Sequence, residues 1–80
     1  MAKILIFEDE KQMAEFIYLE LKHEDYDVDI CYDGEQGYEK AIKIDYDIIL
    51  LDIMLPKING MEVCRRVRIK KDTPVIRRNH

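Results

Sequence analysis

The chain has 80 residues, of which 48% are hydrophobic and 38% are charged, and its formal net charge is −4. This length limits it to one small domain, and the mixture of apolar and charged residues excludes disordered and collagen-like classes. The acidic balance also argues against general nucleic-acid binding.

The first half of the chain alternates between strand and helix patterns. Residues 3–7 form an isoleucine-rich run that is typical of a strand buried on both faces of a parallel sheet. Residues 26–32 alternate between apolar and polar, which predicts a strand at a sheet edge, and Asp33-Gly34 ends it. A helix should follow each strand. The expected inward stripes are Met13, Phe16, Ile17 and Leu21 in the first helix and Tyr38, Ala41 and Ile42 in the second.

The second half continues the alternation. Residues 47–54 are the most apolar stretch and predict a central strand, which Leu55-Pro56 stops. Asn59-Gly60 marks a turn into a third helix, whose inward stripe we expect at Met61, Cys64 and Val67. A fourth strand begins at residues 75–76. The order β-α-β-α-β-α-β predicts an α/β fold with a doubly wound parallel sheet and right-handed crossovers.

Acidic residues end two of the predicted strands. Glu8 and Asp9 follow the first strand, and Asp52 lies at the end of the third. If the strand order is 2-1-3-4, these strands are neighbours at the switch point, and the three acids converge. Clustered carboxylates must protonate or share a cation, and oxygen-only donors favour Mg²⁺ over zinc. Asp9 has a second interpretation, as a cap of the following helix.

Three segments resemble the receiver domain of bacterial two-component response regulators. They are residues 3–10, residues 47–56 with Gly60, and residues 73–76. The resemblance implies a flavodoxin-like fold in which Asp52 is the phosphoacceptor. It also implies that Asp9 ligates Mg²⁺ directly, that Glu8 assists through water, and that the main-chain carbonyl of Met54 completes the protein ligands.

The resemblance further implies a signalling role. The phosphoryl donor would be a sensor histidine kinase, and the domain itself would be no enzyme beyond weak self-phosphorylation and dephosphorylation. Pro56 and Gly60 would shape the loop after the phosphorylation site. The Leu-Pro pair is similar to the subclass whose receivers precede a winged-helix domain, so DNA would be contacted only through an output domain that these 80 residues lack.

The chain departs from the family pattern near its C-terminus. We expect a truncated receiver over residues 1–76 and a tail of non-native character at residues 77–80. The family ends its fourth strand with a serine or threonine and its fifth with a lysine, and neither is found here. Phosphorylation is therefore expected to be impaired, because such donors stabilise phosphoryl oxygens. The chain would then be a fragment, a frameshifted product or an engineered piece.

Truncation also predicts self-association. One sheet face and the fourth strand would lack their cover, which favours a homodimer or a larger assembly. The alternative function is accordingly a self-associating fragment with a structural role only. A nucleotide-binding domain would need a glycine-rich phosphate loop, which the sequence lacks. Nucleic-acid binding by the basic residues between Arg65 and Arg78 is a fourth hypothesis, beside a solvated helix face and tail.

The cysteines and the N-terminus indicate the compartment. Cys31 and Cys64 form no CxxC or Cys/His pattern, so a disulfide framework or zinc site is not expected. The N-terminal apolar run meets acids at residues 8–10, too early for a signal peptide or a membrane span. These features predict a reduced, cytoplasmic protein without membrane contact.

Overall fold

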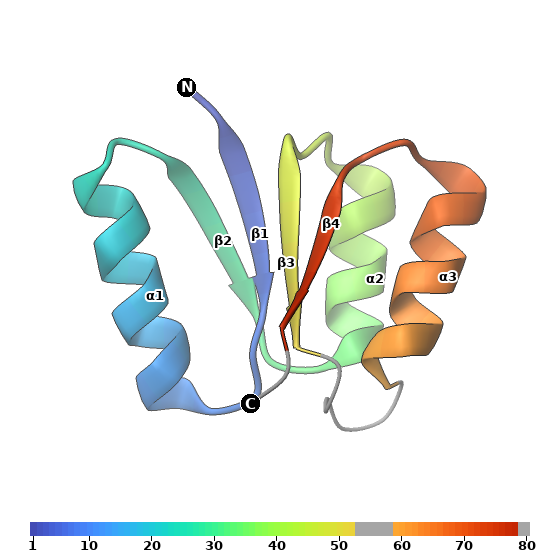
Figure 1. Ribbon diagram of the computed structural model, residues 1–80, viewed down its shortest axis with the longest axis horizontal. Helices are drawn as coiled ribbons and strands as arrows, with labels where there is room; N and C mark the ends of the chain where they lie inside the picture. Colours follow the sequence, from blue (N-terminus) through green and yellow to red (C-terminus); the bar gives the residue numbers. More distant parts are fainter. Residues whose placement is uncertain (53–58, 79–80) are drawn as a thin grey trace.

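The computed structural model describes residues 1–52 and 59–78. Strands and helices alternate along the chain as predicted (Figure 1). The elements are β1 (Lys3–Phe7), α1 (Lys11–His23), β2 (Asp27–Cys31), α2 (Gly34–Lys43), β3 (Ile48–Asp52), α3 (Gly60–Lys70) and β4 (Val75–Arg78). None of the helices in this part of the chain is long and apolar enough to cross a bilayer.

The four strands form one parallel sheet in the order β2-β1-β3-β4. This confirms the predicted 2-1-3-4 order and places β2 at an edge, as its alternating pattern indicated. Within the described residues, β4 pairs with β3 alone and forms the other edge. β4 extends to Arg78, two residues beyond the point at which the sequence placed the end of the receiver pattern. Arginine at both positions weakens the apolar signal, but the main chain continues the ladder.

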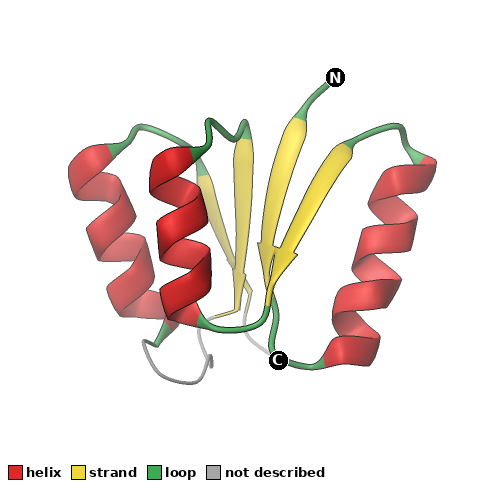
Figure 2. Cartoon of the chain, turned by 180° about the vertical axis from the view of Figure 1, so that it is seen from behind, coloured by secondary structure: helices red, strands yellow, loops and turns green. Residues whose placement is uncertain are grey.

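Helices cover both faces of the sheet. α1 lies on one face, and α2 and α3 lie side by side on the other (Figure 2). The buried residues of the α2/α3 face are Leu5, Phe7, Cys31, Ala41, Tyr46, Ile49, Leu51, Val63, Cys64 and Val67. The smaller α1 face buries Ile4, Ile6 and Val28, against which Ile17, Tyr18 and Leu21 pack. β1 is apolar at consecutive positions because it is covered on both sides.

Local interactions fix where two of the helices begin. The Asp33 carboxylate accepts a hydrogen bond from the Gln36 amide at 2.9 Å, and the Asn59 side chain accepts one from the Glu62 amide at 3.0 Å. Both are N-terminal caps, which explains why Asp33-Gly34 and Asn59-Gly60 mark turns into helices. α2 then approaches the sheet closely at Gly37, where a Cβ atom would overlap the Phe7 ring and the Cys31 sulfur.

Two of the predicted helix stripes were wrong in one residue each. Phe16 and Met61 are exposed, with 61% and 51% of their surface accessible. α1 instead turns Ala14 inward beside the predicted Ile17 and Leu21, and α3 turns Val63 inward beside Cys64 and Val67. Successive helical residues are rotated by about 100°. Residues three positions apart therefore lie near one another on the helix, and more than one set of residues fits the spacing of an inward stripe. Only the docking of the helix on the sheet decides which set is buried.

Candidate metal centre

Two adjacent strands bring the acidic residues to one edge of the sheet. β1 ends at Phe7, immediately before Glu8 and Asp9, and β3 ends at Asp52. Phe7 pairs with Leu51 in the ladder, so the next residues of the two strands, Glu8 and Asp52, are also neighbours. Parallel strands present their carboxyl ends at the same edge, so the sheet order alone produces this convergence.

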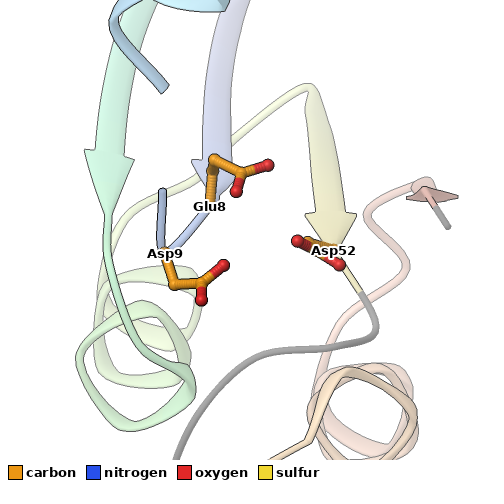
Figure 3. A group of neighbouring side chains, drawn as sticks. All are labelled: Glu8, Asp9 and Asp52. Atoms are coloured by element: carbon orange, nitrogen blue, oxygen red, sulfur yellow. The ribbon is translucent and has the colours of Figure 1, made fainter. Parts of the chain in front are cut away.

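The three carboxylates face a common space (Figure 3). One carboxylate oxygen from each of Glu8, Asp9 and Asp52 can be chosen so that all three lie within 4.8 Å of one another. Glu8 and Asp52 are fully buried, whereas Asp9 is exposed. The backbone amide of Glu8 donates to the Cys31 carbonyl at 3.0 Å, and its carboxylate accepts from the Glu10 amide at 3.1 Å. These bonds hold Glu8 in place between the sheet and the first turn of α1.

The electrostatics of this arrangement favour a cation. Two buried carboxylates and a third at the surface repel one another, and a shared cation would relieve this repulsion. All three donors are oxygen atoms, and within residues 1–52 and 59–78 the metal-binding group contains no histidine or cysteine. This donor set suits a hard ion such as Mg²⁺ better than zinc. Because Asp9 is exposed, such an ion would be accessible to a ligand from solvent.

The structure brings together the three acidic residues that the sequence singled out. Their assignment as metal ligands and phosphoacceptor stays a prediction. Met54 and Pro56 fall outside the described residues, so the proposed backbone ligand of Met54 has no structural account here. Gly60 is buried and begins α3 directly after the Asn59 cap. Glu10 is the residue that precedes α1, and its side chain makes no capping hydrogen bond.

Sequence reasoning missed two features close to the sheet. The Tyr46 hydroxyl donates a 2.6 Å hydrogen bond to Asp29, which ties the start of β3 to the edge strand β2. Burial and the Asp29 carboxylate raise the pKa of Tyr46 well above its usual value. The second feature is a groove between α3 and β4 that contains Arg65, Arg68 and Arg77. The basic run was its signal in the sequence, but the groove itself forms only where α3 packs beside Arg77 of β4.

Comparisons with known proteins agree with this architecture. Residues 4–77 match the model of the response regulator receiver domain. The response regulator ArlR of Staphylococcus saprophyticus is 62% identical over 76 residues, which are 95% of this chain and 34% of that protein. The chain thus spans about a third of this relative's length.

Two solved structures extend the agreement to three dimensions. Thermotoga maritima response regulator TrrA, solved with Mg²⁺ and BeF, superposes with a TM-score of 0.93 at 35% identity, covering 99% of this chain and 70% of that one. A second structure shows TrrA with the histidine kinase ThkA, with a TM-score of 0.90 at 37% identity over 96% of this chain and 67% of that one. In sequence, strand order and the acidic edge of its sheet, the chain belongs to the receiver domain family of two-component response regulators.

Proposed function

We propose that this chain takes a phosphoryl group from a sensor histidine kinase onto Asp52, with Mg²⁺ held by Glu8, Asp9 and Asp52. The observation that carries the proposal is the convergence of the three carboxylates within 4.8 Å at the carboxyl ends of β1 and β3. The solved complexes of TrrA with Mg²⁺ and BeF and with the kinase ThkA support it, because TrrA shares the fold.

The chemistry needs one nucleophile and good positioning. A carboxylate oxygen of Asp52 attacks the phosphorus of the donor, an O–P bond forms, and the N–P bond of a phosphohistidine breaks. The leaving imidazole keeps the electron pair of that bond and takes a proton from solvent. When bound, the cation offsets charge on the carboxylates and on the phosphoryl oxygens. Asp52 is buried at a fixed strand end, and Glu8 is fixed by the Glu10 amide, so the protein positions both groups in advance.

The reaction is proposed to be slow in this chain. In the family, a hydroxyl at the end of the fourth strand contacts the phosphoryl group. The residues that follow Ile76 are Arg77 and Arg78, which supply no hydroxyl. Losing one preorganised donor of this kind typically costs about 10²–10³ in rate. The chain would therefore be a phosphoacceptor of low efficiency and no enzyme beyond weak self-phosphorylation and dephosphorylation.

Intact-mass spectrometry tests the proposal directly. The folded chain is incubated with Mg²⁺ and a small acyl phosphate, and Asp52→Asn serves as the control. One added phosphoryl group on the wild type alone is the expected result. No adduct on a folded wild-type chain after prolonged incubation, or an equal adduct on Asp52→Asn, would refute the assignment of Asp52.

A second candidate function is self-association across the open side of the sheet. Ile76 of β4 is half-exposed. Ile48 and Leu50 of β3 are only partly buried, because they lie on the α1 face of the sheet, where α1 covers mainly β1 and β2. A two-fold pairing of β4 strands would satisfy the open edge, and packing of the two faces against each other would cover these residues. Sedimentation velocity at micromolar concentration should show a dimer, and Ile76→Ser should weaken it. A folded monomer at every concentration would contradict this proposal.

The wider context follows from the relatives as a proposal. The chain would act in the cytoplasm, where a kinase presents its phosphohistidine. Contact with DNA would belong to a winged-helix output domain in a longer protein, because the 76 matched residues cover only 34% of the ArlR relative.

A further inference from the structure

The residue that caps α3 is followed by a glycine, and this pair combines a structural role with a reactive sequence. Asn59 is exposed, and its side-chain oxygen accepts a hydrogen bond from the Glu62 amide at 3.0 Å. Its main-chain carbonyl accepts one from the Val63 amide at 3.1 Å, which is the first hydrogen bond of the helix. Gly60 has no Cβ atom that would hinder the approach of its own nitrogen to the Asn59 side chain.

The start of α3 activates both groups that such a reaction needs. The hydrogen bond from the Glu62 amide draws electrons from the side-chain carbonyl of Asn59, as a donor in an oxyanion hole does. The Gly60 amide opens the helix, where the N–H groups have no acceptor within the helix and lie at the positive end of its dipole. The position therefore makes the Asn59 carbonyl more electrophilic and favours loss of the Gly60 amide proton.

The backbone conformation opposes the reaction by keeping the two groups apart. The ψ angle of Asn59 is 158°, an extended value, and ring closure requires the Gly60 nitrogen to rotate about the Cα–C bond toward the side chain. The same rotation moves the main-chain carbonyl of Asn59, so it breaks the hydrogen bond from Val63. Ring closure thus requires the first turn of α3 to open, and opening of a helix end costs less free energy than global unfolding.

We propose that Asn59 is a site of spontaneous deamidation and that opening of the first turn of α3 sets its rate. The Gly60 nitrogen attacks Cγ of Asn59 and loses its proton, a new N–C bond forms, and the side-chain nitrogen leaves as ammonia. Water then opens the cyclic imide at either of its carbonyl groups, which gives aspartate or isoaspartate. The reaction needs water alone, and Asp52 takes no part in it.

The two products differ in their effect on α3. Aspartate keeps an oxygen at the position that accepts the Glu62 amide, and its negative charge suits the start of a helix. Isoaspartate has an additional carbon in the main chain and a shorter side chain, so it does not reproduce the geometry of this cap. The isoaspartyl form should therefore unfold at a lower temperature than Asn59→Asp, which supplies the aspartyl form for comparison.

The test compares three whole chains, namely the wild type, Met61→Gly and Ile69→Gly. Met61 and Ile69 are exposed apolar residues near the start and the end of α3, and both substitutions weaken the helix to a similar extent. Only Met61→Gly weakens the turn that holds Asn59. The chains are aged at mildly alkaline pH, and circular dichroism verifies that they stay folded. Trypsin then releases residues 58–65 as one peptide, whose mass reports the replacement of NH₂ by OH.

The rates of deamidation decide the proposal. The wild type should react at Asn59 more slowly when folded than in urea, and the peptide should contain both aspartate and isoaspartate. Folded Met61→Gly should react about fivefold faster than the folded wild type, whereas Ile69→Gly should stay within about twofold of it. Equal rates for the folded and the urea-unfolded wild type would overturn the proposal. Equal acceleration in the two variants, or no reaction in folded Met61→Gly, would overturn it as well.

Discussion

Replacing Asp52 with asparagine removes one of the two buried charges at the carboxyl edge of the sheet. Glu8 and Asp52 are both fully buried, and their chosen carboxylate oxygens lie within 4.8 Å. Asparagine has nearly the same shape as aspartate but cannot ionise. The substitution therefore tests the electrostatic cost of the cluster with little change in packing.

The expected magnitude follows from Coulomb's law. Two unit charges 4.8 Å apart at an effective dielectric constant of about 20 repel one another by about 3 kcal/mol. The interactions that Glu8 and Asp52 make with other neighbours offset part of this repulsion. Without divalent cations, Asp52→Asn should thus raise the free energy of unfolding by about 1–3 kcal/mol near neutral pH.

Magnesium should narrow the difference between the free energies of unfolding of the two proteins. The wild type gains RT ln(1 + [Mg²⁺]/Kd), which is about 1.4 kcal/mol at a concentration about tenfold above Kd. Asp52→Asn loses a charged ligand and should gain much less. Urea unfolding followed by circular dichroism, in a chelator and then with Mg²⁺, measures both effects.

The control is Asp72→Asn, the same chemical change at an exposed residue before β4, at the opposite edge of the sheet. It should respond to Mg²⁺ as the wild type does. If Asp52→Asn destabilises the chain in the chelator, or if Mg²⁺ stabilises it as much as the wild type, the carboxylates do not form a shared cation site.

Three further predictions concern the fold. Gly37→Ala should destabilise the chain by about 1–3 kcal/mol, because the added methyl group overlaps Phe7 and Cys31. Glu35→Ala, at an exposed position of the same helix, should not destabilise it. The urea concentrations at half-unfolding compare the two variants, and equal values would contradict the close approach of α2 to the sheet. Burial raises the pKa of Cys31 to about 12, so a thiol reagent at about pH 8 should label it only at the rate of unfolding, and fast labelling of the folded chain would contradict its burial. Hydrogen bonds from Arg65 and Arg66 lower the pKa of Glu62 from 4.5 to about 2, so its stabilising effect is complete above pH 4.5 and is lost as pH falls toward 2. The melting temperatures of the wild type and Glu62→Gln should therefore converge over this interval, and a constant difference would argue against these ion pairs.

The sequence determined much of this protein through short-range patterns. Consecutive apolar residues at 4–7 and 48–51 produce buried strands, and Asp33 and Asn59 cap the helices that follow. These signals depend on backbone preferences and on the spacing of apolar residues, both of which can be read from neighbouring residues along the chain. The acids that end β1 and β3 were visible for the same reason, since the carboxyl end of a strand can be located from its pattern alone.

Tertiary structure decided the features that depend on elements far apart in sequence. Phe16 and Met61 fit the helical period but face solvent, because each helix rotates to place its tightest side on the sheet. β4 runs to Arg78 although its last residues are arginines, since pairing with β3 satisfies the main chain whatever the side chains are. The groove with Arg68 and Arg77 follows from the packing of α3 beside β4. Local patterns thus gave the elements and the acidic edge, whereas the exposed surfaces follow from how the helices dock, which depends on all of their partners at once.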